Sequence, residues 1–507
     1  MPPSSRDPKR WLVLLAVMLA FLPVVLDMTI LHVAVPSLTQ ALGASGTEVL
    51  WIIDIYPLLM AGLLVPMGTL SDRIGNRRIL LTGLAIFAAA SACAAFAPSA
   101  PALIAARVAL ALGGAMILPC VLGLIRKTFE DEAERAMALG LWGTVGAAGA
   151  AVGPLAGGAL LEHFWWGSVF LINVPVMLVV APACHLLLPR REKTLPGKWP
   201  IGQALLLIAG MLLVVYAIKA GFGARQPLPV VALLAGLGAL ILALFVRRQL
   251  RAADPMLDLS LLTHPALVAG LVMAIVTSAA LAGVELTLAQ ELQYVVGKTP
   301  LQAGLFMIPI MAAAALGGPV AGHLSNRLGL RRVASLSLLT AAAMLAFLAK
   351  SDFHDPGLSV PVALAFLGLS LSIGLTASSI AIMGSVEASK GGSAGALEAT
   401  GYELGTGLGI TLFGVFLSGL FRHAIELPAG LSPDLADQAA RTIGDAYIVA
   451  HQLPAEAGAA LIQAGKDAFS QTHAVLLTTS AGVIALLACL VFLLLARAPQ
   501  AQPAADP

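Results

Sequence analysis

The feature that most constrains this chain is a series of apolar stretches, each long enough to cross a lipid bilayer. A membrane-spanning helix needs about 20 mainly apolar residues, and fourteen segments of the 507-residue sequence meet that requirement. The sequence therefore predicts an all-α, polytopic membrane protein. The expected spans lie at residues 11–36, 50–71, 79–98, 101–125, 136–161, 168–188, 201–220, 228–246, 266–291, 301–324, 333–350, 359–384, 395–421 and 474–496.

The composition agrees with this prediction and excludes several other classes of protein. Apolar residues make up 59% of the chain. Charged residues make up 11%, and this share is too small to cover the surface of a soluble globule of this size. The net charge of +2 comes without a basic stripe, so no nucleic-acid partner is expected. The four cysteines lack the spacing of a metal site. Neither an ATP-binding loop nor a nucleophile–base pair is visible, so we expect no enzyme and no metal.

Lysine and arginine in the connections orient the spans, because positive residues are retained on the cytoplasmic side. With the N-terminus inside, the cytoplasmic segments hold 21 of these residues and the outer segments hold seven. A missed or invented span would have scrambled this alternation, so we expect both termini in the cytoplasm. The seven outer residues are Lys219, Arg225, Lys298, Lys350, Arg422, Arg441 and Lys466.

An internal repeat indicates that the chain has two similar halves. The loop Gly68–Arg78 recurs as Gly322–Arg332, with seven of eleven positions identical. A bland alternative is that any short cytoplasmic loop contains arginine and glycine. The offset of eight spans fits two six-helix halves, residues 1–190 and 253–507, separated by an inserted pair of helices within residues 191–252. No Asp, Glu or His lies inside the inserted pair, so it is not expected to carry ions.

The first copy of the loop resembles the signature between the second and third helices of the major facilitator superfamily. That resemblance implies a latch that holds the cytoplasmic side shut, in which Asp72 and Arg73 pair with neighbouring helices. The second copy has Asn326 in place of Asp72, which weakens any latch there. The alternative is a loop that only sets topology. The latch residues implied by the resemblance are Gly68, Asp72, Arg73, Gly75 and Arg77.

Two further motifs lie inside the spans of the first half. Arg107, in the fourth span, resembles an arginine that supports proton coupling in the superfamily; the alternative is a side chain that extends to the membrane interface. The fifth span resembles a signature of drug–proton antiporters, and in this fold it favours export over import. Its small residues allow close helix packing and its proline bends the helix. These residues are Gly149, Gly153, Pro154, Gly157 and Gly158.

Over nearly its whole length the chain resembles the fourteen-span drug–proton antiporter family, through Leu26–Pro36, Leu50–Tyr56 and Glu398–Gly405 as well as the motifs above. The resemblance implies a monomer in the bacterial inner membrane, in contact with lipids, that is driven by the proton motive force without a cofactor. Expected substrates are lipophilic mono- and dications: quaternary ammonium biocides, methyl viologen, dyes such as ethidium and acriflavine, and bisbiguanides such as chlorhexidine. Alternatives are a narrow-specificity proton-coupled metabolite permease of the same fold, a channel or a membrane receptor.

Acidic residues within the spans are the candidate sites for protons and cations. Burial favours the protonated carboxyl group, whereas a nearby cation favours the charged one, and this competition can couple the two ions. Asp27 and Glu285 rank first, because the pseudo-symmetry would place both at the central cavity. Asp54 and Glu162 lie near the outer boundary, where water would solvate them. The other candidates are Glu398, Glu403, Tyr402, which shares a helical face with Glu398, and His32, for which packing against a carbonyl is the alternative.

The connection at about residues 422–472 is the longest outer loop. Ser432 and Pro433 are typical of a helix start, and apolar residues then recur at helical spacing until Pro454 breaks the run. The pattern resumes over residues 457–469. We expect a helical hairpin on the periplasmic face, which either gates the exit or only caps the bundle.

Overall fold

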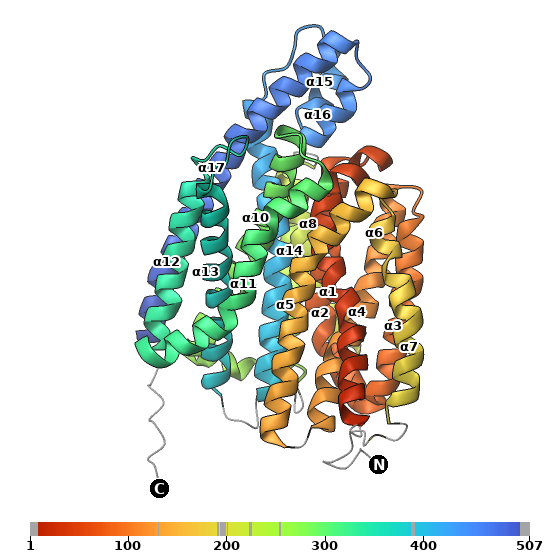
Figure 1. Cartoon of the computed structure of the whole chain (residues 1–507), viewed down its shortest axis with the longest axis vertical. Coiled ribbons are helices and arrows are strands. Elements are labelled where there is room, and N and C mark those ends of the chain that lie inside the picture. Colours follow the sequence, from red (N-terminus) through yellow and green to blue (C-terminus); the bar gives the residue numbers. More distant parts are fainter. Residues whose placement is uncertain are drawn as a thin grey trace.

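The computed structural model describes residues 9–129, 131–189, 192, 199, 201–222, 226–252, 255–386 and 391–496. Fourteen helices in this part of the chain are long and apolar enough to cross a membrane, which confirms the predicted spans. Most extend several residues beyond the predicted limits. Helix α1 begins and α17 ends at one end of the bundle, here called the termini end, while α15 and α16 project from the opposite, loop end (Figure 1).

Twelve of the spanning segments are each one continuous α-helix. They are α1 (Lys9–Leu42), α2 (Gly46–Ile74), α3 (Asn76–Ala95), α4 (Ala100–Thr128), α5 (Glu132–His163), α8 (Ile201–Phe222), α9 (Leu228–Arg251), α11 (Pro300–Leu328), α12 (Leu330–Leu348), α13 (Ser359–Gly384), α14 (Gly391–Ala424) and α17 (Ala455–Ala496). The other two are composite: α6 (Ser168–Leu171) with α7 (Asn173–Leu187), and α10 (Pro265–Gln290) with the π-helix η2 (Glu291–Val295). Three short helices complete the fold: η1 (Leu259–Thr263), α15 (Pro433–Ala439) and α16 (Ile443–Ala450).

Helix boundaries in the two copies of the repeated loop follow from the same residue type. Gly75 ends α2 with φ = 106° and Gly329 ends α11 with φ = 82°, at matched positions of the repeat. Only glycine enters this region of φ without steric cost. The matched starts of these two helices are also alike, because Ser45 and Thr299 each form a capping box with the residue three positions later.

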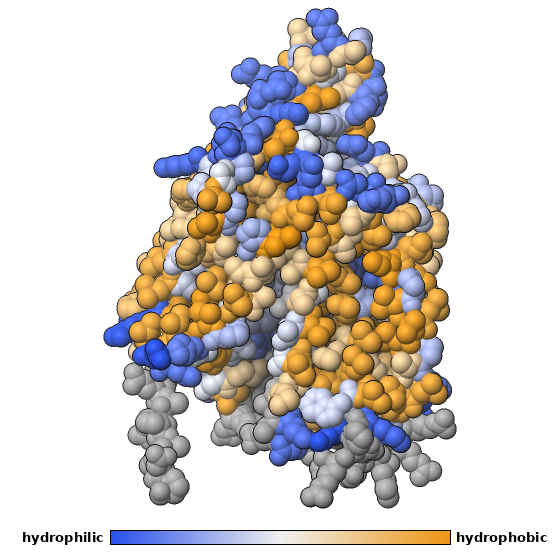
Figure 2. Space-filling model, in the orientation of Figure 1, coloured by the Kyte–Doolittle hydropathy of each residue, from blue (hydrophilic) through white to orange (hydrophobic). Residues whose placement is uncertain are grey.

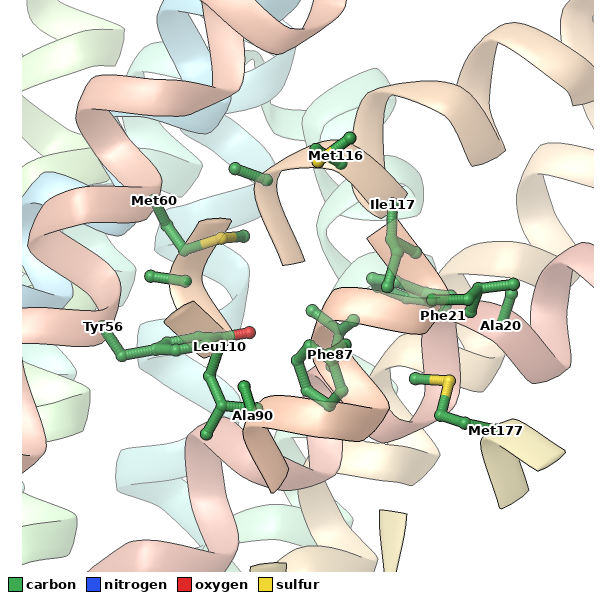
Figure 3. Packing of buried hydrophobic residues seen from close by; sticks show 14 of the residues in the cluster. Ala20, Phe21, Tyr56, Met60, Phe87, Ala90, Leu110, Met116, Ile117 and Met177 are labelled. Atoms are coloured by element: carbon green, nitrogen blue, oxygen red, sulfur yellow. The ribbon is translucent and has the colours of Figure 1, made fainter. Parts of the chain in front are cut away.

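Two large apolar cores divide the helices. Residues of α1 to α7 form most of the first core, and residues of α10 to α13 with α17 form most of the second (Figure 1). Figure 3 shows part of the first core, where the Tyr56 ring of α2 is directed toward Phe87 of α3, between Met60 and Leu110. Helices α8 and α9 lie outside both cores and pack with α2, α14 and η1 through a smaller cluster.

The surface is apolar around the middle of the bundle. Figure 2 shows this apolar belt bounded by hydrophilic residues at both ends, with the most polar surface over the loop end. This distribution is that of a protein whose middle lies in lipid.

The glycines of α5 bring two neighbouring helices into close contact. A Cβ at Gly153 would lie 2.0 Å from Thr29 Oγ1, and a Cβ at Gly157 would lie 2.6 Å from Ile30 Cγ1. Both neighbours belong to α1. A Cβ at Gly158 would lie 2.6 Å from Leu301 Cα on α11. The motif therefore packs α5 against its own half on one face and against the other half at the loop end.

The outer loop differs from the predicted hairpin. Ser432 caps α15 as expected, and its hydroxyl accepts from the Leu435 N–H. The second limb, however, is not a separate helix, because α17 runs without interruption from Ala455 through residues 457–469 into the last span. The polar residues Ser470–His473 interrupt the apolar pattern between residues 457–469 and the predicted span 474–496. No proline or glycine lies among them, so the helix continues through both segments.

Candidate functional site

Asp27 of α1 and Arg107 of α4 form an ion pair in the first half. Both side chains are fully buried, and the Arg107 Nη1 donates to Asp27 Oδ2. The Arg107 Nε also donates to the Ile52 carbonyl at 3.0 Å, and its guanidinium lies 4.6 Å from the Tyr56 ring centroid. The other carboxylate oxygen, Asp27 Oδ1, has no hydrogen-bond partner. Arg107 is therefore held inside the bundle and does not extend to the membrane interface.

Glu285 of α10 and His32 of α1 meet across the boundary between the halves. The His32 Nδ1 lies 3.3 Å from Glu285 Oε2, close enough for an ion pair when the imidazole is protonated. The two atoms are not aligned as a hydrogen bond. His32 thus faces a carboxylate, and its ring makes no bond to a carbonyl in the part of the chain that the structure describes. A second contact joins the same helices, because the Gln293 side chain donates to the Val33 carbonyl.

Asp54 of α2 joins three parts of the molecule. Its carboxylate accepts from Lys219 of α8 at 2.7 Å and from the Thr411 hydroxyl of α14 at 2.5 Å. The expectation that Asp54 is solvated near the outer boundary is wrong, since its side chain is 0% exposed. The expectation that the inserted pair carries no ions stays a prediction, although Lys219 places a buried charge within α8, where it is 4% exposed.

Glu398 and Tyr402 of α14 are bonded to each other, as their spacing of four residues allows. The Tyr402 hydroxyl donates to Glu398 Oε1 at 2.6 Å and also lies 3.1 Å from the Leu375 carbonyl oxygen. Glu403, the next residue, points elsewhere, and its Oε2 has no hydrogen-bond partner. The same helix therefore presents one bonded and one unsatisfied carboxyl group. Glu162, by contrast, is exposed at the loop end, as expected of a solvated residue.

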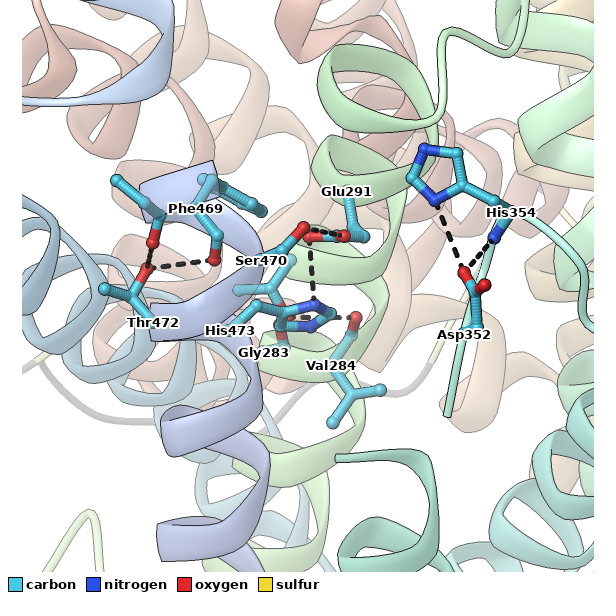
Figure 4. Close-up of polar contacts among 11 residues, drawn as sticks. Gly283, Val284, Glu291, Asp352, His354, Phe469, Ser470, Thr472 and His473 are labelled. Atoms are coloured by element: carbon cyan, nitrogen blue, oxygen red, sulfur yellow. Dashed lines mark hydrogen bonds and ion pairs between the residues drawn. The ribbon is translucent and has the colours of Figure 1, made fainter. Parts of the chain in front are cut away.

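A further buried acid was not among the expected sites. Glu291 lies in the π-helix that ends α10, where its Oε1 accepts from the Ser470 hydroxyl at 2.6 Å and its Oε2 lies 3.4 Å from His473 Nδ1 (Figure 4). Both partners belong to α17. Local π-helical geometry is often associated with functional positions.

The two halves are in contact at the loop end and apart at the termini end along the α5–α11 boundary. Gly158 and Gly304 approach the opposite helix at the loop end, whereas Gly140, Gly143 and Gly322 at the termini end have no atom within 4 Å of a built Cβ. Figure 2 shows a furrow between these halves below mid-height. The structure is therefore closed toward the loop end.

A cavity of about 90 Å³ lies inside this closed end. Residues from the two halves, the inserted pair and the loop helices all line it. They include Leu50, Lys219, Gln290, Tyr294, Phe421 and Ile443.

The predicted latch loop makes contacts within the first half. Glu192 accepts from the backbone N–H of Asn76 and of Arg77, at 3.0 and 2.7 Å, and Arg77 donates to the His185 carbonyl. Asp72 is exposed. Gly68 lies within α2, and Gly75 is the residue at which that helix ends. Among the described residues, the loop makes no ion pair to the second half, and residues 387–390, next to α14, lie outside them.

Comparison with known proteins places this arrangement in a family. A model described as the Major Facilitator Superfamily matches residues 17–281 and 266–432. The chain belongs to this superfamily. It is 46% identical over 490 residues to the methyl viologen resistance protein SmvA of Salmonella typhimurium, covering 97% of this chain and 99% of that protein. It is 37% identical over 472 residues to the multidrug efflux pump LfrA of Mycolicibacterium smegmatis, with coverage of 92% and 93%.

Solved structures agree on the fold of this facilitator. A bacterial homologue of the human lysosomal transporter Spinster matches with a TM-score of 0.69 at 18% identity, covering 98% of this chain and all of that one. The protein is therefore a multi-pass membrane transporter rather than an enzyme.

Three of the buried charges that sequence reasoning missed, Lys219, Glu291 and His473, lie near predicted span ends. Lys219 falls inside the predicted span 201–220 but was assigned to the outer side, and Glu291 and His473 lie at or next to predicted limits. The sequence feature that could have identified them is an ionisable residue within about one helical turn of a predicted span end. Such a residue becomes buried when the helix extends beyond the predicted limit.

Proposed function

We propose that this transporter exports lipophilic organic cations in exchange for protons, by alternating access. The observation that carries the proposal is a set of carboxyl groups within the spanning helices: Asp27, Glu285 and Glu398 are buried, and Glu403 is half-buried with one buried oxygen. An ionisable group inside a membrane protein is costly and generally marks an ion or substrate path. The names of the related exporters, SmvA and LfrA, support cations and drugs as the cargo.

The arrangement supports exchange because each carboxyl group has a different environment. Asp27 has a permanent cation beside it, Glu285 has an imidazole that carries charge only when protonated, and Glu403 has an unsatisfied oxygen. A proton and a drug cation that compete for such groups cannot occupy them together. Loading one therefore releases the other, which is the requirement for antiport.

Several carboxyl groups also suit the energetics of exporting divalent cations. Moving a dication out against about 100 mV costs about 4.6 kcal/mol, at about 2.3 kcal/mol per charge. One entering proton offsets half of the charge moved, and two offset all of it. We therefore propose at least two proton-binding carboxyl groups in the cycle.

We propose that the protein lies in the bacterial inner membrane, and the distribution of positive residues supports an orientation with both termini in the cytoplasm. In that orientation the loop end is periplasmic, and the described conformation is open toward the cytoplasm, ready to collect a cation. The proton gradient supplies the energy without a cofactor, and a monomer contains both halves of the path.

Ethidium efflux from cells that express the protein tests the proposal. Efflux above that of an empty-vector control, abolished by a protonophore while ATP is maintained, is the expected result. Protonophore-insensitive efflux would contradict proton coupling. The competing metabolite permease predicts no efflux of any organic cation.

A further inference from the structure

The inserted helix α8 places a cation at a carboxylate that the two halves share. Lys219 Nζ lies 2.7 Å from both carboxylate oxygens of Asp54 of α2, and Asp54 Oδ2 also accepts from the Thr411 hydroxyl of α14. Bulk water does not screen the charges of this pair, because Asp54 and Thr411 are 0% exposed. The ion pair is therefore part of the contact between the first half, the second half and the inserted pair.

An aromatic face completes the surroundings of the ammonium. The Nζ of Lys219 lies 3.5 Å from the Trp51 ring centroid, and Tyr216 stacks on the same ring at 6.3 Å. A carboxylate combined with the face of a tryptophan is the chemistry by which proteins recognise organic ammonium ions. Lysine is an unusual occupant of such a place, since burying its charge requires full compensation.

The site borders empty space. Lys219 lines the cavity of about 90 Å³ at the loop end, together with Leu50 of α2 and Gly414 of α14. A lysine has four rotatable methylene bonds, so its head can leave the carboxylate while the helix stays in place. Space into which to move is present beside it.

We propose that Asp54, Trp51 and Thr411 form a second cation site, and that Lys219 is its tethered occupant when no organic cation is bound there. A monovalent quaternary ammonium or phosphonium group, or one end of a dication, displaces the lysine head on its way out. When that cation departs, the lysine returns and keeps the carboxylate compensated. The proposal rests on export of organic cations as the protein's function, and it gives the inserted pair a part in that function.

Competition predicts the effect of removing the tethered cation. A tethered group acts at an effective concentration in about the millimolar range, so Lys219→Met removes a strong competitor of similar length. We expect the purified variant to bind ethidium about tenfold more tightly than the wild type in equilibrium titrations at pH 8 without a gradient. The gain must vanish in the double variant Asp54→Asn/Lys219→Met, which has no carboxylate, and in Trp51→Leu/Lys219→Met it must shrink. Lys298→Met, a loop-end lysine near Phe306, is the matched control and should bind like the wild type.

The wild-type protein provides a second measurement, in case Lys219→Met does not fold. Displacement of the lysine head frees its amine, so saturating tetraphenylphosphonium should increase acetylation of Lys219 relative to Lys298, read by mass spectrometry. Equal or weaker ethidium binding by a folded Lys219→Met variant would overturn the proposal. So would acetylation of Lys219 that the cation leaves unchanged or lowers. Because neither measurement uses a proton gradient, a failure of proton coupling in cells remains distinguishable from a failure of this site.

Discussion

At the scale of single residues, Asp27 is a fully buried carboxyl group that is paired with the permanent charge of Arg107. We predict that Asp27→Asn abolishes efflux of all cations while the protein still inserts, because an amide neither carries a proton nor compensates a cation. The change also leaves Arg107 buried without its carboxylate, which costs about 3–5 kcal/mol of stability. Efflux of ethidium, membrane abundance and thermal unfolding in detergent measure the two effects.

A double variant separates transport from stability at this pair. In Asp27→Asn/Arg107→Met no buried charge is left unpaired, so the melting temperature should recover toward that of the wild type while efflux stays absent. Recovery of efflux together with stability would show that Asp27 is structural. Wild-type resistance of the single variant to both mono- and dications would equally refute its transport role.

Glu285 differs from Asp27 because its neighbour, His32, carries charge only when protonated. We predict a graded loss for Glu285→Gln, heavier for dications such as methyl viologen than for monocations such as ethidium. The reason is that a second negative site matters most when two positive charges occupy the path. Resistance and efflux assays with both substrates measure the ratio; equal losses would make Glu285 a proton-only group, and no loss would place it outside the path.

At the scale of elements, the glycines of α5 allow a direct test of the closed loop end. A Cβ at Gly158 would lie 2.6 Å from Leu301 Cα and 2.7 Å from the Pro300 carbonyl oxygen of α11. Overpacking of this kind costs about 1–3 kcal/mol, and here only the closed arrangement bears the cost. We predict that Gly158→Ala shifts the population toward the state open at the loop end and slows efflux.

Distance measurements between spin labels on the loop-end turns of α5 and α11 would detect the shift. Gly143→Ala is the matched control in the same helix, because its Cβ would meet no atom within 4 Å. An unchanged distance distribution in Gly158→Ala, or an equal change in Gly143→Ala, would contradict the prediction.

Elements were easier to predict from the sequence than the partners of single residues. Span number depends on apolar length and was predicted from it, and the helix start at Ser432 was visible from its cap and the following proline. Most helix ends were placed several residues too early or too late, although Gly75 and Gly329 end α2 and α11. The partners of the buried charges were not, since Asp54 meets Lys219 and Thr411 at sequence separations of 165 and 357 residues. Helical periodicity assigns a residue to a face, but the neighbour of that face depends on how the helices pack.

At the scale of the whole molecule, helix α16 connects both halves at the loop end. Its Asp445 accepts from the Gly46 N–H at the start of α2, and the Tyr447 hydroxyl donates to the Tyr294 carbonyl of η2. Ile443 and Gly444 of the same helix line the loop-end cavity. A helix that is bonded to both halves and covers the cavity is placed to act as a gate, although the same contacts would serve a passive cap.

Replacing the loop helices with a flexible glycine–serine linker distinguishes a gate from a cap. Because α17 is continuous, the linker must replace only residues 429–453 and leave residues 455–496 intact. If α15 and α16 gate the exit, we predict that the variant binds ethidium like the wild type but exports it at a changed rate, because the contacts at Gly46 and Tyr294 no longer have to break in each cycle. Gly46→Ala should disturb the same contact by a single substitution, since its Cβ would lie 2.4 Å from Thr442 Cγ2 and displace α16. Gly482→Ala, where a Cβ meets no atom within 4 Å, is its control. Unchanged efflux at normal expression in both the linker variant and Gly46→Ala would refute the gate and leave the loop helices as a cap.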